Sequence, residues 1–152
     1  MTELTHHDDL TVPPEELFAL FLRPALAVQL APAAFPLEFL AGPEVLTPGD
    51  SFTLRTRRYG LSQKLIHQLE ALDPLRRLVF VQVRGPFRSY RLEQRFEPLA
   101  QGCRLIEEVT FEPPGGVLGQ LLTVARLRGD LEELYRLRRE VFRVRGWLAG
   151  EA

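Results

Sequence analysis

The stretch LVFVQVRGPFRSYRLEQRFEPLAQGCRLIEEVTFE, residues 78–112, contains three strand-like segments separated by two turn signals. We predict strands over 78–84, 87–97 and 103–112, with the turns at Gly85-Pro86 and Gln101-Gly102. Apolar and polar side chains alternate along these segments, which is typical of strands with one face against a core. Because the connections are only a few residues long, we expect the strands to pair as antiparallel neighbours.

More strands are predicted upstream of this stretch. The turn signals there are Gly42-Pro43, Pro48-Gly49-Asp50, Gly60 and Asp73-Pro74. They separate strand-like segments at short intervals, so we predict strands over 37–46, bent at Gly42-Pro43, and over 51–59 and 61–72. Alternation from Leu4 to Val12 predicts an opening strand.

Two short helices are predicted between the opening strand and the sheet. Pro13-Pro14-Glu15-Glu16 is typical of a helix start, because proline fits the first turn and carboxylates favour the positive end of the helix dipole. Pro24 ends this helix, and residues 26–30 form the second.

The last part of the chain is predicted to form one long helix over 117–148, after the Pro113-Pro114-Gly115-Gly116 break. Its apolar stripe comprises Leu118, Leu121, Leu122, Ala125, Leu131, Leu134, Val141 and Phe142. Gly129 marks a kink or a close contact in this helix. The predicted fold class is therefore α+β, with a curved antiparallel sheet of about six to seven strands wrapped around a long C-terminal helix.

Composition limits the classes of function. A chain of 152 residues with 45% hydrophobic and 26% charged residues suits one globular domain, predicted over 1–152. A net charge of -1 does not favour nucleic acid as a partner, and no apolar run is long enough for stable membrane insertion. Cys103 is the only cysteine, and Met1–Asp9 is unlike a signal peptide, so we expect a reducing, cytoplasmic location.

One segment also carries a resemblance to a known family. Gln82-Val83-Arg84-Gly85-Pro86-Phe87, followed by Tyr90, Gln94 and Phe96, resembles the START-like, or SRPBCC, superfamily. The most similar branch is that of bacterial polyketide cyclase/dehydrase and lipid-transport-like proteins. Matching pieces also occur at Pro13–Phe18, Asp73-Pro74 and Pro114–Gly119. The resemblance implies a helix-grip fold that encloses a hydrophobic ligand between the sheet and the C-terminal helix.

The resemblance implies an acidic position on the last strand, which Glu107 matches, and it leaves catalysis open because only some members are enzymes. Related sequences often carry histidines where this chain has Leu92 and Gln94. That departure weakens any interpretation that needs a titrating base on this strand.

The interior face is predicted to be apolar with a few polar groups. Strand alternation places Cys103, Leu105, Glu107, Val109 and Phe111 on one face. Gln94 is expected to approach Glu107 across a hairpin. The predicted ligand-binding residues are Leu65, His67, Phe80, Gln82, Arg84, Tyr90, Leu92, Gln94, Leu105, Glu107, Leu121, Leu122 and Ala125. The alternative is that Glu107 forms a structural ion pair with Arg84 or another arginine.

Other chemistry-bearing residues give weaker signals. Glu107 and His67 are the candidate catalytic residues, since a histidine can act as an acid or base near neutral pH. Cys103 has no clear histidine partner. Along a strand, His6 and Asp8 face away from His7 and Asp9, so no metal site is predicted, and no cofactor is expected.

The leading hypothesis is a protein that binds or carries a small hydrophobic ligand, such as a lipid, polyketide, quinone or aromatic metabolite. One alternative is a cyclase or dehydratase acting on a polyketide-like substrate. A second is a protein-interaction module that uses the outer sheet face or the arginine-rich last helix. Trp147 and Leu148 are expected either to cap the core or to form a homodimer contact.

Overall fold

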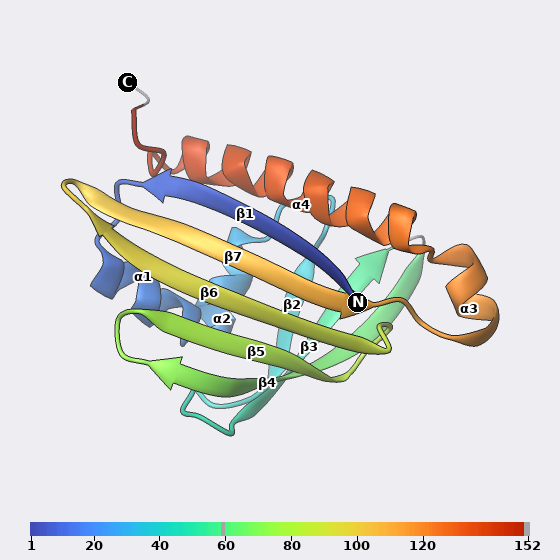
Figure 1. Cartoon of the computed structure of the whole chain (residues 1–152). Coiled ribbons are helices and arrows are strands. Elements are labelled where there is room, and N and C mark those ends of the chain that lie inside the picture. The colour runs from blue at the N-terminus through green and yellow to red at the C-terminus, as the bar shows by residue number, and fades with distance from the viewer. Residues whose placement is uncertain (59, 151–152) are drawn as a thin grey trace.

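The computed structural model describes residues 1–58 and 60–150, and its architecture is an open, strongly curved antiparallel sheet with a long helix beside it (Figure 1). The strands are β1 (Thr2–Leu10), β2 (Leu37–Ala41), β3 (Ser51–Arg58), β4 (Leu61–Asp73), β5 (Arg77–Arg84), β6 (Ser89–Leu99) and β7 (Gly102–Glu112). The helices are α1 (Pro14–Phe21), α2 (Pro24–Ala27), the 3-10 turn η1 (Val28–Leu30), α3 (Gly116–Leu121) and α4 (Val124–Val144). The fold is the helix-grip fold that the sequence predicts.

The strand order in the sheet is β1-β7-β6-β5-β4-β3-β2. Strands β2 to β7 form a meander in chain order. The first strand, β1, pairs with the last one, β7. Because the sheet curls, β2 and β3 lie behind the central strands in Figure 1, and α4 runs along β1. The short segment η1 also contacts α4, so the N-terminal helices and α4 approach each other on the same side of the sheet.

Two strand predictions differ from the structure at their ends. The strand predicted over 37–46 stops at Ala41, because Gly42 takes φ +149 and the following segment leaves the sheet. A side chain at Gly42 would also collide with Phe52 on β3. Tyr59, the last residue of the strand predicted over 51–59, lies outside the described residues.

The single helix predicted over 117–148 is two helices with a break at Leu122 and Thr123. Thr123 has extended backbone angles, and its side chain accepts a hydrogen bond from the Arg126 amide, so it acts as the N-cap of α4. Gly129 lies inside α4, which continues through it, and a Cβ there would meet nothing within 4 Å. The predicted kink or close contact at Gly129 is therefore absent.

The chain after α4 returns to the first strand. The Thr11 amide donates to the Trp147 carbonyl at 2.7 Å, and Leu148 forms a bridge with Leu10. Trp147 and Leu148 both pack against the core, and Trp147 stacks on Phe142. Of the two expected roles for this pair, the structure shows core capping.

The buried residues form two clusters. One lies under α1 and η1 and contains Leu17, Leu30 and Phe80, while the other lies under α4 and contains Phe111 and Leu131. Within residues 1–58 and 60–150, no helix is both long and apolar enough to cross a membrane.

Candidate ligand-binding cavity

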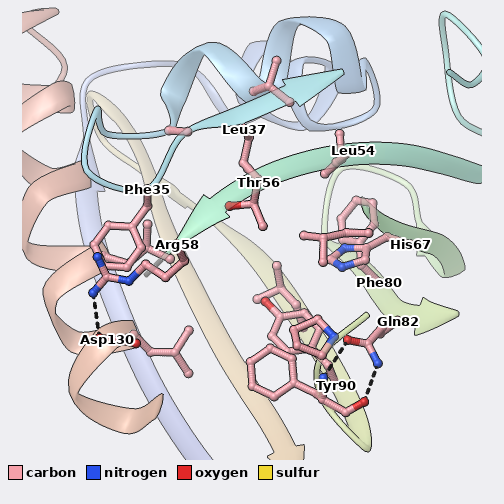
Figure 2. Close-up of a pocket in the computed structure, with 18 of the residues that line it drawn as sticks. Phe35, Leu37, Leu54, Thr56, Arg58, His67, Phe80, Gln82, Tyr90 and Asp130 are labelled. Carbon is pink, nitrogen blue, oxygen red and sulfur yellow. Dashed lines mark hydrogen bonds and ion pairs between the residues drawn. The ribbon is translucent and has the colours of Figure 1, made fainter. Parts of the chain in front are cut away.

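A cavity of about 410 Å³ lies inside the curl of the sheet, between the α1–η1 segment and α4. Its apolar wall includes Phe52 and Leu54 from β3, Leu65 from β4, Phe80 from β5, Leu92 from β6, and Leu127, Leu131 and Leu134 from α4. Figure 2 shows the side chains of Leu54, His67 and Phe80 gathered around one side of this space. A volume above 300 Å³ with a mostly apolar wall is typical of a small-molecule site.

Strand alternation explains why the sheet presents this wall. Along β7, every second side chain is buried, from Cys103 to Phe111. Glu107 therefore lies on the interior face, with 1% of its surface exposed. Burying a carboxylate in an apolar wall costs free energy unless the carboxylate is paired. The hydrogen-bond partners of Glu107 therefore determine whether it is available to a ligand.

The partners of Glu107 come from β6 and α4. Gln94 stands opposite Glu107 in the β6–β7 register, as expected, and its Nε2 donates to Glu107 Oε2 at 3.1 Å. Arg138 on α4 donates Nη1 to Oε2 at 3.1 Å and Nη2 to Oε1. Both carboxylate oxygens are thus held by charge-assisted hydrogen bonds. The structure therefore shows an ion pair between Glu107 and an arginine, which is the contact that the structural alternative expects.

The arginine in this pair is Arg138 and not Arg84, which lies exposed at the end of β5 and does not line the cavity. Sequence reasoning missed Arg138, although a signal was present. Leu131, Tyr135, Arg138 and Phe142 follow one another at spacings of four, three and four, so Arg138 lies on the buried stripe of α4. An arginine on an apolar stripe indicates a buried acidic partner.

A second buried acid, Asp8, lies on β1 next to this pair. Arg139 Nε donates to Asp8 Oδ1 at 2.7 Å, and His6 Nε2 lies 2.9 Å from Asp8 Oδ2. Burial alone would raise the pKa of Asp8, but the hydrogen bonds with His6 and Arg139 outweigh it and hold the pKa below its ordinary value. The acids and arginines at this end of the cavity therefore neutralise one another.

His67 lines the cavity from β4 and contacts two aromatic rings. Its ring centroid lies 6.0 Å from that of Phe52 and 5.5 Å from that of Tyr90. Burial lowers the pKa of His67 to about 4, so the imidazole is neutral at pH 7. A neutral imidazole offers one hydrogen-bond donor and one acceptor. Tyr90 also lines the cavity, and burial beside Glu107 raises the pKa of its hydroxyl.

Both polar atoms of the Gln82 side chain form hydrogen bonds with the backbone of Phe87. Its Nε2 donates to the Phe87 carbonyl at 2.8 Å, and the Phe87 amide donates to its Oε1 at 3.3 Å (Figure 2). Gln82 lines the cavity, but its amide is used to close the β5–β6 turn.

Nine of the thirteen predicted ligand-binding residues line the cavity: Leu65, His67, Phe80, Gln82, Tyr90, Leu92, Gln94, Glu107 and Leu122. The other four lie elsewhere. Leu105 is fully buried in the core, and Arg84 is exposed. Leu121 is 61% exposed and Ala125 is exposed, because the break at Leu122 and Thr123 turns them away from the interior.

The rim of the cavity contains an ion pair that sequence reasoning also missed. Arg58 Nη2 at the end of β3 lies 2.8 Å from Asp130 Oδ1 on α4, and the Arg58 guanidinium lies 4.2 Å from the centre of the Phe35 ring. Figure 2 shows this bridge between the sheet and α4. No short motif marks such a pair, since 72 residues separate its members.

Fold and cavity together define a helix-grip protein with an apolar cavity between the sheet and α4. The family model described as "Polyketide cyclase / dehydrase and lipid transport" matches residues 1–141, so the chain belongs to this family. No curated protein matches the chain.

Several solved structures have the same fold. Protein CV1439 from Chromobacterium violaceum is 18% identical, with a TM-score of 0.70 over 93% of this chain and 95% of that one. Ara h 8.0201 is 16% identical, with a TM-score of 0.64 over 93% of this chain and 95% of that one. The di-domain ARO/CYC StfQ from the steffimycin biosynthetic pathway is 15% identical, with a TM-score of 0.71 over 92% of this chain and 48% of that one.

Proposed function

We propose that residues 1–152 act as one binding unit that holds or carries a small hydrophobic molecule in the internal cavity. The single observation that carries this proposal is the 410 Å³ space walled by apolar side chains from strands β3 to β6 and from α4. The family description, which includes lipid transport, supports the same function.

Affinity in such a site comes from removing apolar ligand surface from water, at roughly 25 cal/mol per Å² before the costs of ordering. Ring pairs such as Phe52 with Phe80 hold part of the wall in place. A wall that is formed before the ligand arrives loses little entropy on binding.

The test is a titration with the neutral fluorescent probe N-phenyl-1-naphthylamine, together with mass spectrometry of a solvent extract of the purified protein. Leu65→Trp fills the cavity, while Val83→Trp places the same ring at an exposed position of the same sheet. We expect Leu65→Trp to weaken probe binding by roughly tenfold or more and Val83→Trp to leave it unchanged. A wild-type protein that binds no probe, or equal binding by both variants, would contradict the proposal. Thermal melts establish that both variants fold.

A second candidate function is cyclase or dehydratase chemistry, because His67 and Glu107 line the same cavity. Arg138 and Gln94 donate hydrogen bonds to the carboxylate of Glu107. The neutral imidazole of His67 is therefore better placed than Glu107 to accept a proton from a substrate. Turnover of a polyketide-like substrate that is lost in His67→Gln, with probe binding retained, would favour this function.

A further inference from the structure

The charges in the cavity wall are already matched within the protein. Among the described lining residues, the cations are Arg58 and Arg138. Arg58 is paired with Asp130, and Arg138 is paired with Glu107 and lies 3.8 Å from Asp8. An anionic ligand would therefore lose its hydration without gaining a cation of its own, which is costly in an apolar wall.

Two neutral polar groups in the wall have no hydrogen-bond partner in the part of the chain that the structure describes. Within residues 1–58 and 60–150, neither the His67 imidazole nor the Tyr90 hydroxyl takes part in a hydrogen bond. The ring centroids of His67 and Tyr90 lie 5.5 Å apart, so both polar groups line the same part of the cavity. Each provides one donor and an acceptor, a pattern that matches a hydroxyl group.

The amide of Gln94 lies at the same end of the cavity. Gln94 is 1% exposed, and its Oε1 has no hydrogen-bond partner among the described residues. The amide cannot be turned around, because Nε2 must face the Glu107 carboxylate. Oε1 is thus a buried acceptor without a partner, as the Nε of Arg138 is a buried donor without one among the described residues. Because both atoms are buried, the polar groups that a ligand meets at this end are those of His67 and Tyr90.

We infer that the ligand is an uncharged apolar molecule that carries a hydroxyl group, held at the His67, Tyr90 and Gln94 end of the cavity, and that carboxylates of the same shape are rejected. This inference rests on the proposed function, because it specifies which hydrophobic molecules the cavity accepts.

The size of the cavity selects the probes. At about 410 Å³ the cavity lies within the range of sites that bury a small organic molecule, so a bicyclic compound fits inside it. The compounds 2-naphthol, 2-methylnaphthalene and 2-naphthoate share one bicyclic ring and differ only in the substituent. At pH 7 the phenol is neutral and the carboxylic acid is ionised.

The experiment measures the affinity of each compound for the wild-type protein by isothermal titration at pH 7. One additional hydrogen bond contributes about 1 kcal/mol, so we expect 2-naphthol to bind about fivefold more tightly than 2-methylnaphthalene. We expect 2-naphthoate to bind at least about tenfold more weakly than 2-naphthol. Equal or tighter binding of 2-naphthoate would overturn the inference without the need for any variant.

Tyr90→Phe removes only the hydroxyl and should reduce 2-naphthol affinity about fivefold while leaving 2-methylnaphthalene within about twofold. Leu92→Met is the matched control, since it changes the same strand and the same cavity wall without a polar group. It should not change the ratio of the two affinities. If Tyr90→Phe leaves that ratio unchanged, the inference is wrong.

The two proposals fail in different ways. If the wild-type protein binds N-phenyl-1-naphthylamine but does not prefer 2-naphthol over the other two compounds, only the inference is overturned. If it binds neither that probe nor any naphthalene, the proposed function is overturned, and the inference with it.

Discussion

Glu107 and Arg138 connect β7 to α4 through a buried ion pair. Gln94 donates to the same carboxylate, so this end of the cavity is a connected polar group set in an apolar interior. Such pairs add little net stability compared with apolar residues, but removing one member leaves a buried charge without its partner.

Glu107→Gln should lower the free energy of unfolding by about 3 kcal/mol, because among the described residues Arg138 then keeps only Asp8, at 3.8 Å, as an acidic neighbour. Urea denaturation measures the change. Glu108→Gln, on the opposite face of β7, is the matched control and should stay within about 0.5 kcal/mol of the wild type. The double variant Glu107→Leu/Arg138→Met should recover most of the loss. A Glu107→Gln variant as stable as the control would show that the pair is not structural.

The low pKa of His67 leads us to expect that the free energy of unfolding depends on pH. Its pKa is about 4 in the folded protein and 6.5 as the ordinary value, so between these values the unfolded chain binds more protons than the folded one. The free energy of unfolding should therefore fall as the pH falls from 6.5 to 4, by on the order of 3 kcal/mol from this residue. His67→Gln should remove that part of the slope, measured by urea denaturation at a series of pH values. Parallel slopes in both proteins would contradict the low pKa.

The break between α3 and α4 decides which apolar residues face the interior. Leu122 lines the cavity, whereas Leu121 and Ala125 are turned outward. The periodicity of the sequence does not reveal the break, because no proline or glycine stands at Leu122 and Thr123 and the apolar spacing continues across it. Thr123 is a preferred N-cap residue, which is the one local signal.

Thr123→Ala should destabilise the protein by about 1 kcal/mol, because the Arg126 amide loses its hydrogen-bond acceptor. Thr123→Ser keeps the oxygen and should stay close to the wild type. Native-state hydrogen exchange should show the loss as faster exchange in the first turn of α4. Equal exchange in the two variants would show that the cap does not hold this end of the helix.

At the scale of the whole molecule, local patterns predict the meander better than the pairing between distant segments. Alternation and turn residues place β3 to β7 to within a few residues, because both signals are local. The pairing of β1 with β7 joins segments about a hundred residues apart, and no local pattern predicts it. The partners of Glu107 illustrate the same limit, since Gln94 follows from a hairpin and Arg138 requires the packing of α4 on the sheet.

An apolar molecule is expected to occupy the space between the curved sheet and α4. Intermolecular nuclear Overhauser effects between 2-naphthol and methyl-labelled protein test this expectation most directly. A molecule bound in the cavity should show contacts from its ring protons to the methyl groups of Leu65 and Leu92, which line the cavity. Contacts confined to exposed methyl groups such as those of Val117 and Val144 would contradict it.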